Sequence, residues 1–261
     1  MTRAPGHASE IAAEAAGNGH RLVVAVGGDG TLCEVVQGIR DAGRGEVGIL
    51  PLGTGNDAAR TLGIPLEIDA AAATLLDGAR REVDLMRVGD HVVLNAVGIG
   101  LLGAINVNAA AIKVVRGIAA YLAAAAVSLF RYPGPTVRVR ADGFEFEGPM
   151  VILAVHNGPT TGGGFRLTPG ARPDDGRLDA CLVEDLSAAR RLSRLVSALR
   201  GTLGARPGSH PFAFTRLEIE CDTPLPCHLD GNTFHIEPPG VVVEVMPRAL
   251  SVVVPARTAS T

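Results

Sequence analysis

The sequence predicts an α/β N-terminal domain with a parallel sheet, followed by a mainly antiparallel β-sandwich domain. Its length of 261 residues suits one large domain or two ordinary ones, at about 150 residues per domain. The first eighty-odd residues alternate between helix and strand patterns, which is typical of a parallel sheet with helices on its faces. From about Arg87 onward, short β-branched runs are typical of an antiparallel sandwich or barrel. We place the α/β domain at 1–87 and the β-rich domain at 88–246, with 247–261 a candidate to return to the first domain.

The elements of the first domain follow from local patterns. Helices are expected in segments of high helix propensity, and strands where an apolar run is too brief for a helix and ends at glycine or proline. The expected elements are, in order, a helix over Ser9–Ala16, a strand over Arg21–Val26, a helix over Thr31–Ile39, a strand over Val47–Leu50 and a helix from about Asp57. Such short apolar strands are typical of a parallel sheet that is buried on both faces.

The elements of the second domain are short β-branched runs separated by Gly, Pro, Asp and Asn. The expected strands are Val92–Val97, Thr136–Arg140, Met150–Val155, Leu178–Val183, Leu217–Glu220, Thr233–Ile236 and Val241–Val245, with helices at about Ala104–Phe130 and Ser187–Leu203. The Ala-rich stretch 117–130 is bracketed by arginines and is shorter than the roughly 20 apolar residues that span a bilayer. We therefore expect a buried helix there and no transmembrane segment.

Composition excludes several classes of protein. With 47% apolar and 20% charged residues and a net charge of -3, disorder, a collagen fold and nucleic-acid binding are poorly supported. Lys113 is the only lysine, so no G-x-x-x-x-G-K-[ST] phosphate loop can form and a Schiff base would have to use Lys113. The four cysteines include no C-x-x-C pair and the N-terminus does not resemble a signal peptide, which favours a reducing cytosol.

Two glycine-rich turns stand between a predicted strand and a predicted helix. The first comprises Gly27, Gly28, Asp29, Gly30 and Thr31, and the second Pro51, Leu52, Gly53, Thr54, Gly55, Asn56 and Asp57. Backbone amides and the helix dipole make such a turn an anion site, and an aspartate within it suits Mg²⁺ or a ribose hydroxyl. A plain tight turn is an equal alternative for the first turn alone. Two such turns at the ends of neighbouring parallel strands, however, would face one crevice.

These motifs resemble the catalytic domain of the diacylglycerol kinase and sphingosine kinase superfamily, especially its soluble bacterial lipid kinases. The resemblance covers about Thr2 to Pro255 and implies the fold of the NAD kinase and diacylglycerol kinase type, with 88–246 as the lipid-substrate domain. It rests on G-G-D-G-T, on P-L-G-T-G-N-D-x-A-R, and further on Asn157, 162–164, 169–171, 174–179 and, in part, 228–231. NAD kinases and phosphofructokinases share the first motif, but the second turn differs from theirs.

The resemblance implies ATP and Mg²⁺ as cofactors and assigns them residues. The implied nucleotide and catalytic-metal site comprises Thr2, Gly27, Gly28, Asp29, Gly30, Thr31, Gly53, Thr54, Gly55, Asn56, Asp57 and Asp84. In similar kinases, the acidic residues at the positions of Asp29, Asp57 and Asp84 organise the catalytic metal through water.

The resemblance also implies a second metal and a base. A structural Mg²⁺ would be held by the Asp175 side chain and by the main-chain carbonyls of Arg172 and Arg177. Asp230 occupies the first acidic position of the family's D-G-E motif, where a base takes the proton of the lipid hydroxyl. Without the resemblance, local sequence alone favours an ordinary turn at both Asp175 and Asp230.

Two departures from the family pattern bear on activity. Asn232 stands where the family usually has the glutamate of D-G-E, and a neutral amide cannot serve as a general base. The chain also begins at about the family's first nucleotide-contacting threonine, so the family's first strand and its N-P-x-x-G turn are expected to be missing. A misassigned start codon is one explanation, and a genuine loss that weakens ATP binding is the other.

Two further patterns leave alternatives open. Arg190, Arg191 and Arg194 form a basic stripe on a helix whose opposite positions are Leu192, Leu195, Val196 and Leu199. This stripe would either face anionic lipid or be an ordinary solvated face. A second set, Cys221, Cys227, His228 and His235, contains zinc-ligating residue types, but its spacing fits no common zinc site and favours ordinary β-sandwich residues.

The leading hypothesis is an ATP- and Mg²⁺-dependent kinase that phosphorylates the hydroxyl of diacylglycerol or a related lipid. We expect it in the cytoplasm, peripherally associated with the membrane that holds its lipid substrate. A non-catalytic relative that binds nucleotide or lipid is the first alternative, and a kinase of a soluble substrate such as NAD is the second. The lipid cannot be chosen from sequence because acyl-chain pockets use interchangeable apolar residues. The oligomeric state is also open, with a homodimer among the options.

Overall fold

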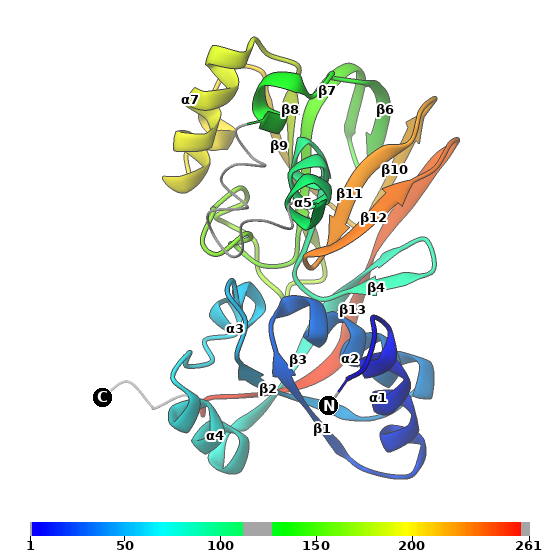
Figure 1. Ribbon diagram of the computed structural model, residues 1–261, viewed down its shortest axis with the longest axis vertical. Helices are drawn as coiled ribbons and strands as arrows, with labels where there is room; N and C mark the ends of the chain where they lie inside the picture. The colour runs from blue at the N-terminus through cyan, green and yellow to red at the C-terminus, as the bar shows by residue number, and fades with distance from the viewer. Residues whose placement is uncertain (1, 112–126, 257–261) are drawn as a thin grey trace.

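The computed structural model describes residues 2–111 and 127–256 and confirms the predicted fold class (Figure 1). The lower part consists of α1 (His7–Gly17), β1 (Leu22–Gly27), α2 (Asp29–Ala42), β2 (Glu46–Pro51), α3 (Asp57–Thr61), α4 (Ile68–Asp77) and β3 (Ala79–Val88). The upper part consists of β4 (His91–Val93), β5 (Ala96–Gly100), α5 (Leu101–Ala111), β6 (Thr136–Ala141), β7 (Phe144–His156), β8 (Leu178–Glu184), α7 (Ala188–Leu199), a 3₁₀ turn (Leu203–Ala205), β9 (Ser209–Phe214), β10 (Arg216–Cys221), β11 (Leu225–Leu229) and β12 (Asn232–Ile236). The last strand, β13 (Gly240–Val254), runs through both parts (Figure 1).

The lower part has a parallel sheet, as the alternating sequence pattern predicts. β1 pairs in parallel with β2, and β2 pairs in parallel with β13. On β1, Val23 and Ala25 point into a core that α1 and α2 complete with apolar side chains such as Ala12 and Val36. Because strand side chains alternate between faces, this pattern leaves the other residues of β1 on the opposite face of the sheet.

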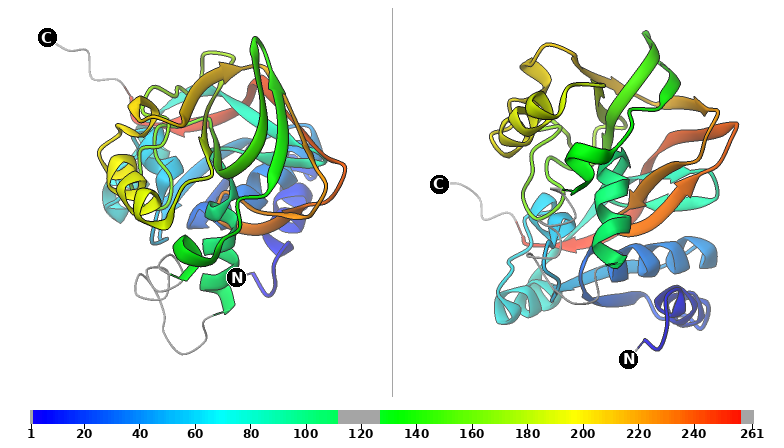
Figure 2. Two further views of the ribbon diagram at one scale, coloured as in Figure 1. Left: turned by 90° about the horizontal axis from the view of Figure 1, so that it is seen from above. Right: turned by 45° about the horizontal axis from the view of Figure 1, so that its top comes forward.

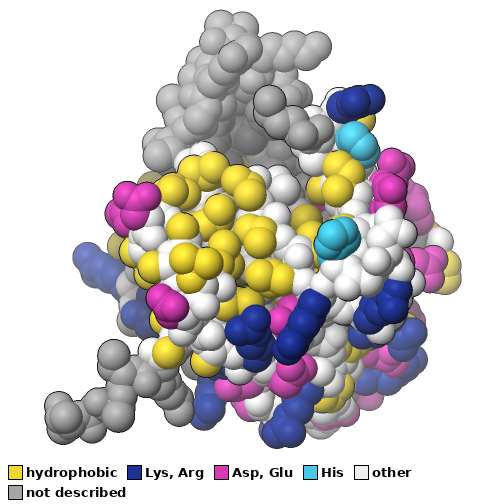
Figure 3. Space-filling model, turned by 90° about the horizontal axis from the view of Figure 1, so that it is seen from below, with side chains coloured by type: hydrophobic (Ala, Val, Ile, Leu, Met, Phe, Trp, Pro, Cys, Tyr) yellow, Lys and Arg dark blue, Asp and Glu magenta, His cyan; other side chains and the backbone are white. Residues whose placement is uncertain are grey.

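The opposite face of this sheet is only partly covered. Around Gly48 it brings together Leu22, Val24 and Leu75, the last of these from α4. Val26 of β1, on the same face, is 53% exposed. Figure 3 shows that hydrophobic side chains gather on this underside of the molecule.

The upper part is a sandwich of antiparallel strands around a large apolar core. One layer continues from β13 through β10 and β6 to β7, and the other contains β5, β7, β8, β9, β11 and β12. The long strand β7 belongs to both layers, because residues 144–149 pair with β6 and residues 152–156 pair with β5. The buried core between the layers includes Met150, Phe214 and Leu217, all completely buried.

Three expectations about elements need correction. The single strand expected over Val92–Val97 is divided into β4 and β5, because Leu94 and Asn95 donate their amides to the Asp230 carboxylate instead of a neighbouring strand. The sequence reasoning also missed α4, β3, β9 and β11. The helix expected over Ala104–Phe130 is present as α5 and as a helical stretch over 127–131; the residues between these segments, Lys113 included, lie outside the described part of the chain.

Within the described ranges, no helix is long and apolar enough to cross a membrane.

Candidate active site

The first glycine-rich turn lies at the junction of β1 and α2. Gly28 is the N-cap of α2, and no side chain caps the helix, so the first amides of α2 are left for solvent or an anion. Gly27 must be small, because a Cβ on it would lie 2.8 Å from Oγ1 of Thr31. The residues expected to bind phosphate therefore form the expected geometry, an uncapped helix N-terminus that follows a strand.

The second turn lies directly against the first. The amide of Leu52 donates to the carbonyl of Gly27 at 2.9 Å, and a Cβ on Gly53 would come within 2.4 Å of Gly28 Cα. Asn56 fixes the turn from within, since its Oδ1 accepts from the amide of Gly53 at 2.9 Å and its Nδ2 donates to the carbonyl of Gly53 at 2.8 Å. Asn56 has φ 52°, a left-handed conformation that asparagine tolerates better than most residues.

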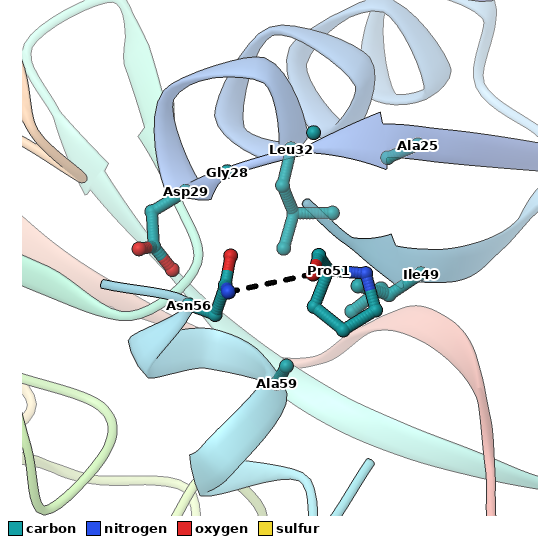
Figure 4. A pocket seen from close by; sticks show the side chains of 9 residues that line it. Ala25, Gly28, Asp29, Leu32, Ile49, Pro51, Asn56 and Ala59 are labelled. Atoms are coloured by element: carbon teal, nitrogen blue, oxygen red, sulfur yellow. Dashed lines mark hydrogen bonds between the residues drawn. The ribbon is translucent and has the colours of Figure 1, made fainter. Parts of the chain in front are cut away.

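The contact between the turns leaves little empty space between them. A cavity of about 10 Å³ remains beneath them, lined by residues that include Ala25, Leu32 and Ile49, and it holds no more than one water molecule. Figure 4 shows Asp29 and Asn56 at this cavity, the first from α2 and the second from the turn before α3. Thr54, by contrast, is exposed on the outside of the second turn.

Asp29 and Asp57 flank the same glycine. A Cβ on Gly55 would lie 3.2 Å from Oδ2 of each carboxylate. Asp29 Oδ1 accepts from the amide of Ala58 at 3.0 Å, and Asp57 Oδ2 accepts from the amide of Gly163 at 2.7 Å. The hydrogen bond from Gly163 to Asp57 also joins the α/β part to the Gly162–Gly164 motif of the β-rich part.

The pair of carboxylates fits a divalent cation. Asp57 is 5% exposed, and its Oδ1 is buried without a hydrogen-bond partner among the described residues. Burial, and to a lesser extent the negative charge of Asp29, raise the pKa of Asp57. An unsatisfied buried oxygen beside a second carboxylate is the environment that a hard cation such as Mg²⁺ would relieve.

Asp84, the third predicted acid, is buried and bonded to backbone amides. Its carboxylate accepts from the amide of Gly176 at 2.7 Å and from the amide of Arg248 at 2.7 Å, and its carbonyl accepts from Nδ2 of Asn157 at 2.7 Å. The side chain is fully buried. Asp84 therefore ties β3 to the turn at 173–176 and to β13, and both of its carboxylate oxygens are occupied by backbone donors.

Asp230 lies in the turn between β11 and β12, with φ 46°. Its carboxylate accepts from the amides of Leu94 at 2.8 Å, Asn95 at 3.1 Å and Ala96 at 2.7 Å. Burial is the largest influence on this group and raises its pKa to about 7, although the amide donors oppose the change and the charge of Asp29 adds to it. Asp230 is thus held rigidly, with its ionisation balanced near neutrality.

Asn232, at the start of β12, reaches the first turn. Its Nδ2 donates to the carbonyl of Gly30 at 3.4 Å, and a Cβ on Gly30 would lie 2.8 Å from its Oδ1. The position that departs from the family motif therefore faces the phosphate-type turn.

The predicted side-chain ligand of the structural metal lies at the surface. Asp175 is exposed, and its Oδ1 accepts from the amide of Arg177 at 3.1 Å. Burial, and then the negative charge of Asp175, raise the pKa of the partly buried Asp179. Arg172 contacts Asp174 at 3.8 Å. An exposed carboxylate in a turn can accept a cation, so Asp175 remains the candidate ligand of this site.

Groups of three or more His, Cys, Asp or Glu residues arranged to hold a metal ion are absent from the described part of the chain, so the zinc alternative at Cys221, Cys227, His228 and His235 gains no support.

Asn95 is a site residue that the sequence reasoning missed. It is 3% exposed, its Oδ1 accepts from Oγ1 of Thr61 at 2.9 Å, and its Nδ2 donates to the carbonyl of Thr160 at 2.9 Å. It thereby connects α3, the Asp230 amide cluster and the loop that precedes Gly162. A lone asparagine within an otherwise apolar run was the available signal. Thr2, at the other extreme, is exposed in the segment before α1.

Comparison with known proteins agrees with this geometry. Residues 1–88 match the model of the diacylglycerol kinase catalytic domain, and residues 95–254 match that of the YegS C-terminal NAD kinase beta sandwich-like domain. A Pseudomonas aeruginosa protein named "Probable lipid kinase YegS-like" is 37% identical over 98% of this chain and 84% of its own length. A relative of the same name from Pseudomonas putida is 34% identical over 98% of this chain and 84% of its own.

Solved structures show the same fold. A crystal structure of a diacylglycerol kinase from Bacillus anthracis aligns with a TM-score of 0.74 at 23% identity, over 97% of this chain and 83% of that one. Yeast NADH kinase complexed with NADH aligns with a TM-score of 0.52 at 12% identity, over 91% of this chain and 62% of that one. The two touching turns, the acidic residues beside them and these matches lead to one conclusion: the chain belongs to the YegS-like lipid kinase family, whose N-terminal part is a diacylglycerol kinase catalytic domain.

Proposed function

We propose that this protein transfers the γ-phosphoryl group of ATP to the hydroxyl of diacylglycerol or a related lipid. The observation that supports this most is the placement of Asp29 and Asp57 on either side of Gly55, next to two glycine-rich turns, the first of which opens an uncapped helix N-terminus. Phosphoryl transfer requires positioning and charge neutralisation above all, and this arrangement provides both. Membership of a lipid kinase family supports the choice of a lipid as acceptor.

Each part of the reaction would fall to different residues of the chain. Amides at the start of α2 and the outer rim of the second turn would hold the phosphates, with Thr31 and Thr54 beside them. Asp29 and Asp57 would hold Mg²⁺, which supplies charge neutralisation of the phosphates when it is bound. Asp230 would take the proton as the hydroxyl oxygen bonds to the γ-phosphorus and the bond to the leaving ADP oxygen breaks. A pKa of about 7 suits a base that works near neutral pH.

A non-catalytic role is the second candidate, and two observations favour it. Asn232 replaces the family glutamate beside Gly30, and both oxygens of Asp230 already accept amide hydrogen bonds. In such a relative, nucleotide or lipid would still bind, but no phosphate would be transferred. We also propose peripheral association with the cytoplasmic face of a membrane, because the acceptor lipid would reside there.

The test is phosphate transfer from labelled ATP to a panel of lipids that includes diacylglycerol, a sphingoid base and ceramide, with NAD as the soluble acceptor. Asp29→Asn should remove most of the activity and leave the melting temperature nearly unchanged. Asp90→Asn, in the exposed turn between β3 and β4, is the matched control and should behave as the native protein does. Transfer to NAD with none to any lipid would refute the proposal and revive the soluble-substrate alternative.

The same preparation can locate the nucleotide without any turnover. Mg-ATP should slow hydrogen exchange of amides in 28–31 and 53–57, and Asp29→Asn should reduce this protection. Protection without transfer to any acceptor would identify a nucleotide-binding relative that has lost catalysis. An absence of protection in both turns would show that the site is assigned incorrectly.

A further inference from the structure

The base and the metal-binding carboxylates of the proposed reaction lie on different parts of the molecule. Asp57 begins α3 in the α/β part, whereas Asp230 lies between β11 and β12 in the β-rich part. Figures 1 and 2 show α3 at the boundary between these two parts. Displacement of a reacting group by about 1 Å can lower a rate by about a hundredfold. The contacts across this boundary therefore bear directly on phosphoryl transfer.

The side chain of Asn95 crosses this boundary. Its Oδ1 accepts from Oγ1 of Thr61, the last residue of α3, at 2.9 Å. Its Nδ2 donates to the carbonyl of Thr160, in the loop after β7, at 2.9 Å. Asn95 is 3% exposed, so loss of either bond would leave a buried polar group unpaired. The carboxamide thus joins segments that are distant in the sequence.

Both partners of this carboxamide lead to Asp57. Thr61 lies in the same helix as Asp57, four residues later, so about one turn of helix separates them. Thr160 lies three residues before Gly163, whose amide donates to Asp57 Oδ2 at 2.7 Å. The side chain of Asn95 is therefore connected to the metal-binding carboxylate by two routes, one through α3 and the other through the loop after β7.

The backbone of Asn95 leads to Asp230. Its amide donates to both carboxylate oxygens of Asp230, at 3.1 and 3.2 Å, and it is the middle one of the three successive amides that hold this group. The carbonyl of Asn95 accepts from the amide of Asn157 at 2.8 Å. One residue therefore connects the proposed base, through its backbone, to the proposed metal site, through its side chain.

Gly158 leaves space for the hydrogen bond between Asn95 and Thr61. A Cβ on Gly158 would lie 2.3 Å from Asn95 Oδ1 and 2.3 Å from Thr61 Oγ1. The φ angle of Gly158 is not positive, so glycine is needed here for space rather than for backbone conformation. Any larger residue would displace at least one of the two bonded groups.

We propose that Asn95 is a positioning residue of the kinase reaction, which fixes Asp230 relative to the carboxylates of Asp29 and Asp57. This inference rests on the proposed function, because the spacing matters only if Asp230 is the base and the other two carboxylates bind the metal.

The role of Asn95 has a signature in the pH dependence. Its backbone amide and those of its two neighbours favour the ionised form of Asp230, so a looser Asn95 should leave Asp230 protonated up to a higher pH. The titratable groups whose charges are coupled to Asp230 are Asp29 and Cys33, both on α2, and neither is changed in the variants below. A residue that only stabilised the fold would lower activity without moving the midpoint of the pH profile.

The test is kcat against pH in the labelled-ATP assay. Asn95→Ala should lower kcat at pH 7 by about tenfold to a hundredfold, as loss of a residue that orients a functional group typically does, and should raise the midpoint by roughly half a pH unit or more. Thr61→Val removes only the donor to Asn95 Oδ1 and should act in the same direction by a smaller factor. Thr61→Ser keeps the hydroxyl and should behave as the native protein does.

A double variant tests whether Thr61 acts through Asn95. In Asn95→Ala protein, Thr61→Val should have no further effect on kcat or on the midpoint, whereas losses at independent sites would add. Thr74→Val is the matched control, because it removes a hydroxyl of α4 that bonds to the carbonyl of Ala70 at 3.0 Å, and it should change neither quantity. The melting temperature of each variant separates loss of position from loss of fold, and the Thr61 pair decides the question if Asn95→Ala does not fold.

A direct titration separates this inference from the proposed function. In protein labelled with ¹³C at the aspartate carboxyl carbons, the Asp230 signal, identified by its absence from Asp230→Asn, should titrate at higher pH in Asn95→Ala and Thr61→Val than in the native protein. If this shift occurs but the native protein phosphorylates no lipid, the proposed function fails and the hold of Asn95 on Asp230 stands. If the native protein is active but neither variant moves the pH midpoint or the Asp230 signal, the positioning role is overturned and the function stands. Equal losses in Thr61→Ser and Thr61→Val, or additive losses in the double variant, would also overturn it.

Discussion

The carboxylate of Asp230 is surrounded by three backbone amides that come from residues 134 to 136 positions earlier in the chain. These donors would ordinarily keep a carboxylate ionised, yet burial and the charge of Asp29 outweigh them and raise the pKa to about 7. The residue is therefore partly protonated at neutral pH. A base of this kind is active only in its deprotonated form, which makes the pH dependence of the reaction informative.

The first prediction concerns Asp230 and Asn232. If Asp230 is the base, lipid phosphorylation by the native protein should rise with pH through a midpoint at about 7 and level at roughly one to two pH units above it, because the deprotonated fraction follows that curve. Asp230→Asn should lower turnover by about 10² to 10⁴ and abolish the rise. Asn232→Glu, which restores the family acid beside Gly30, should raise turnover or leave it unchanged. The measurement is kcat against pH for the three proteins on the same diacylglycerol micelles.

Two outcomes would redirect this assignment. Native protein with almost no activity, and strong activity in Asn232→Glu alone, would make the family glutamate the essential base. Equal turnover in all three proteins would leave neither residue as the base. Because removal of a buried carboxylate can also unfold the chain, the melting temperature of each variant is the accompanying control.

At the scale of elements, the site depends on how closely the ends of β1 and β2 approach each other. Gly28 and Gly53 are in backbone contact, and the bond from Leu52 to Gly27 holds the two turns in register. The amides at the start of α2 and the carboxylates near α3 therefore belong to one rigid unit. A side chain at this contact would have to push the two turns apart.

The second prediction uses that contact. Gly53→Ala places a Cβ 2.4 Å from Gly28 Cα, a distance at which the backbone must move. Because overpacking of this kind typically costs about 1 to 3 kcal/mol, the melting temperature should fall by several degrees and nucleotide affinity should fall with it. Gly17→Ala, at the end of α1 with no atom within 4 Å of the added Cβ, is the matched control and should be neutral or slightly stabilising. A Gly53→Ala protein as stable as the control would mean that the turns are not in contact.

The elements that sequence reasoning predicted well are those with a clear local signal. β1, α2 and β2 alternate apolar runs with glycine, and the turn motifs between them are enough to single out Asp29 and Asp57 as neighbours. The break between β4 and β5 had no such signal, since it arises from Asp230 far along the chain. The burial of Arg191 on α7 was equally hidden, because Arg191 donates to the carbonyls of Leu129 and Tyr132, which no sequence pattern identifies.

At the scale of the whole molecule, β13 joins the two parts. Its first half pairs with β10 in the sandwich, and its second half pairs with β2 in the parallel sheet, while β3 pairs along most of its length. The fold class could be predicted because each part has its own pattern. The joining of both parts in one sheet could not be predicted, because it depends on pairing between segments that are distant in the sequence. The domain boundary at residue 87 stays a prediction.

Asp84 adds a second connection between distant segments. Its carboxylate holds the amide of Gly176, in the loop that contains Asp175, and the amide of Arg248, where the pairing of β13 with β3 shifts register. An ion bound at Asp175 would therefore strengthen a loop that is already attached to both β3 and β13. Its effect should extend to the stability of the whole fold.

The last prediction tests whether Mg²⁺ binds at this loop. A ligand that binds only the folded state stabilises it by about 2.7 kcal/mol at a concentration of about one hundred times its Kd, which for a chain of this size is a rise of about 5 to 10 °C in melting temperature. In the absence of nucleotide, Asp175→Ala should abolish this Mg²⁺-dependent rise, because it removes the only side chain assigned to the ion. Asp29→Asn, at the other acidic site, should retain the rise, and Asp90→Ala controls for the loss of an exposed turn carboxylate. An unchanged rise in Asp175→Ala would exclude the ion from this loop, and a rise lost only in Asp29→Asn would assign it to the pair of carboxylates beside Gly55.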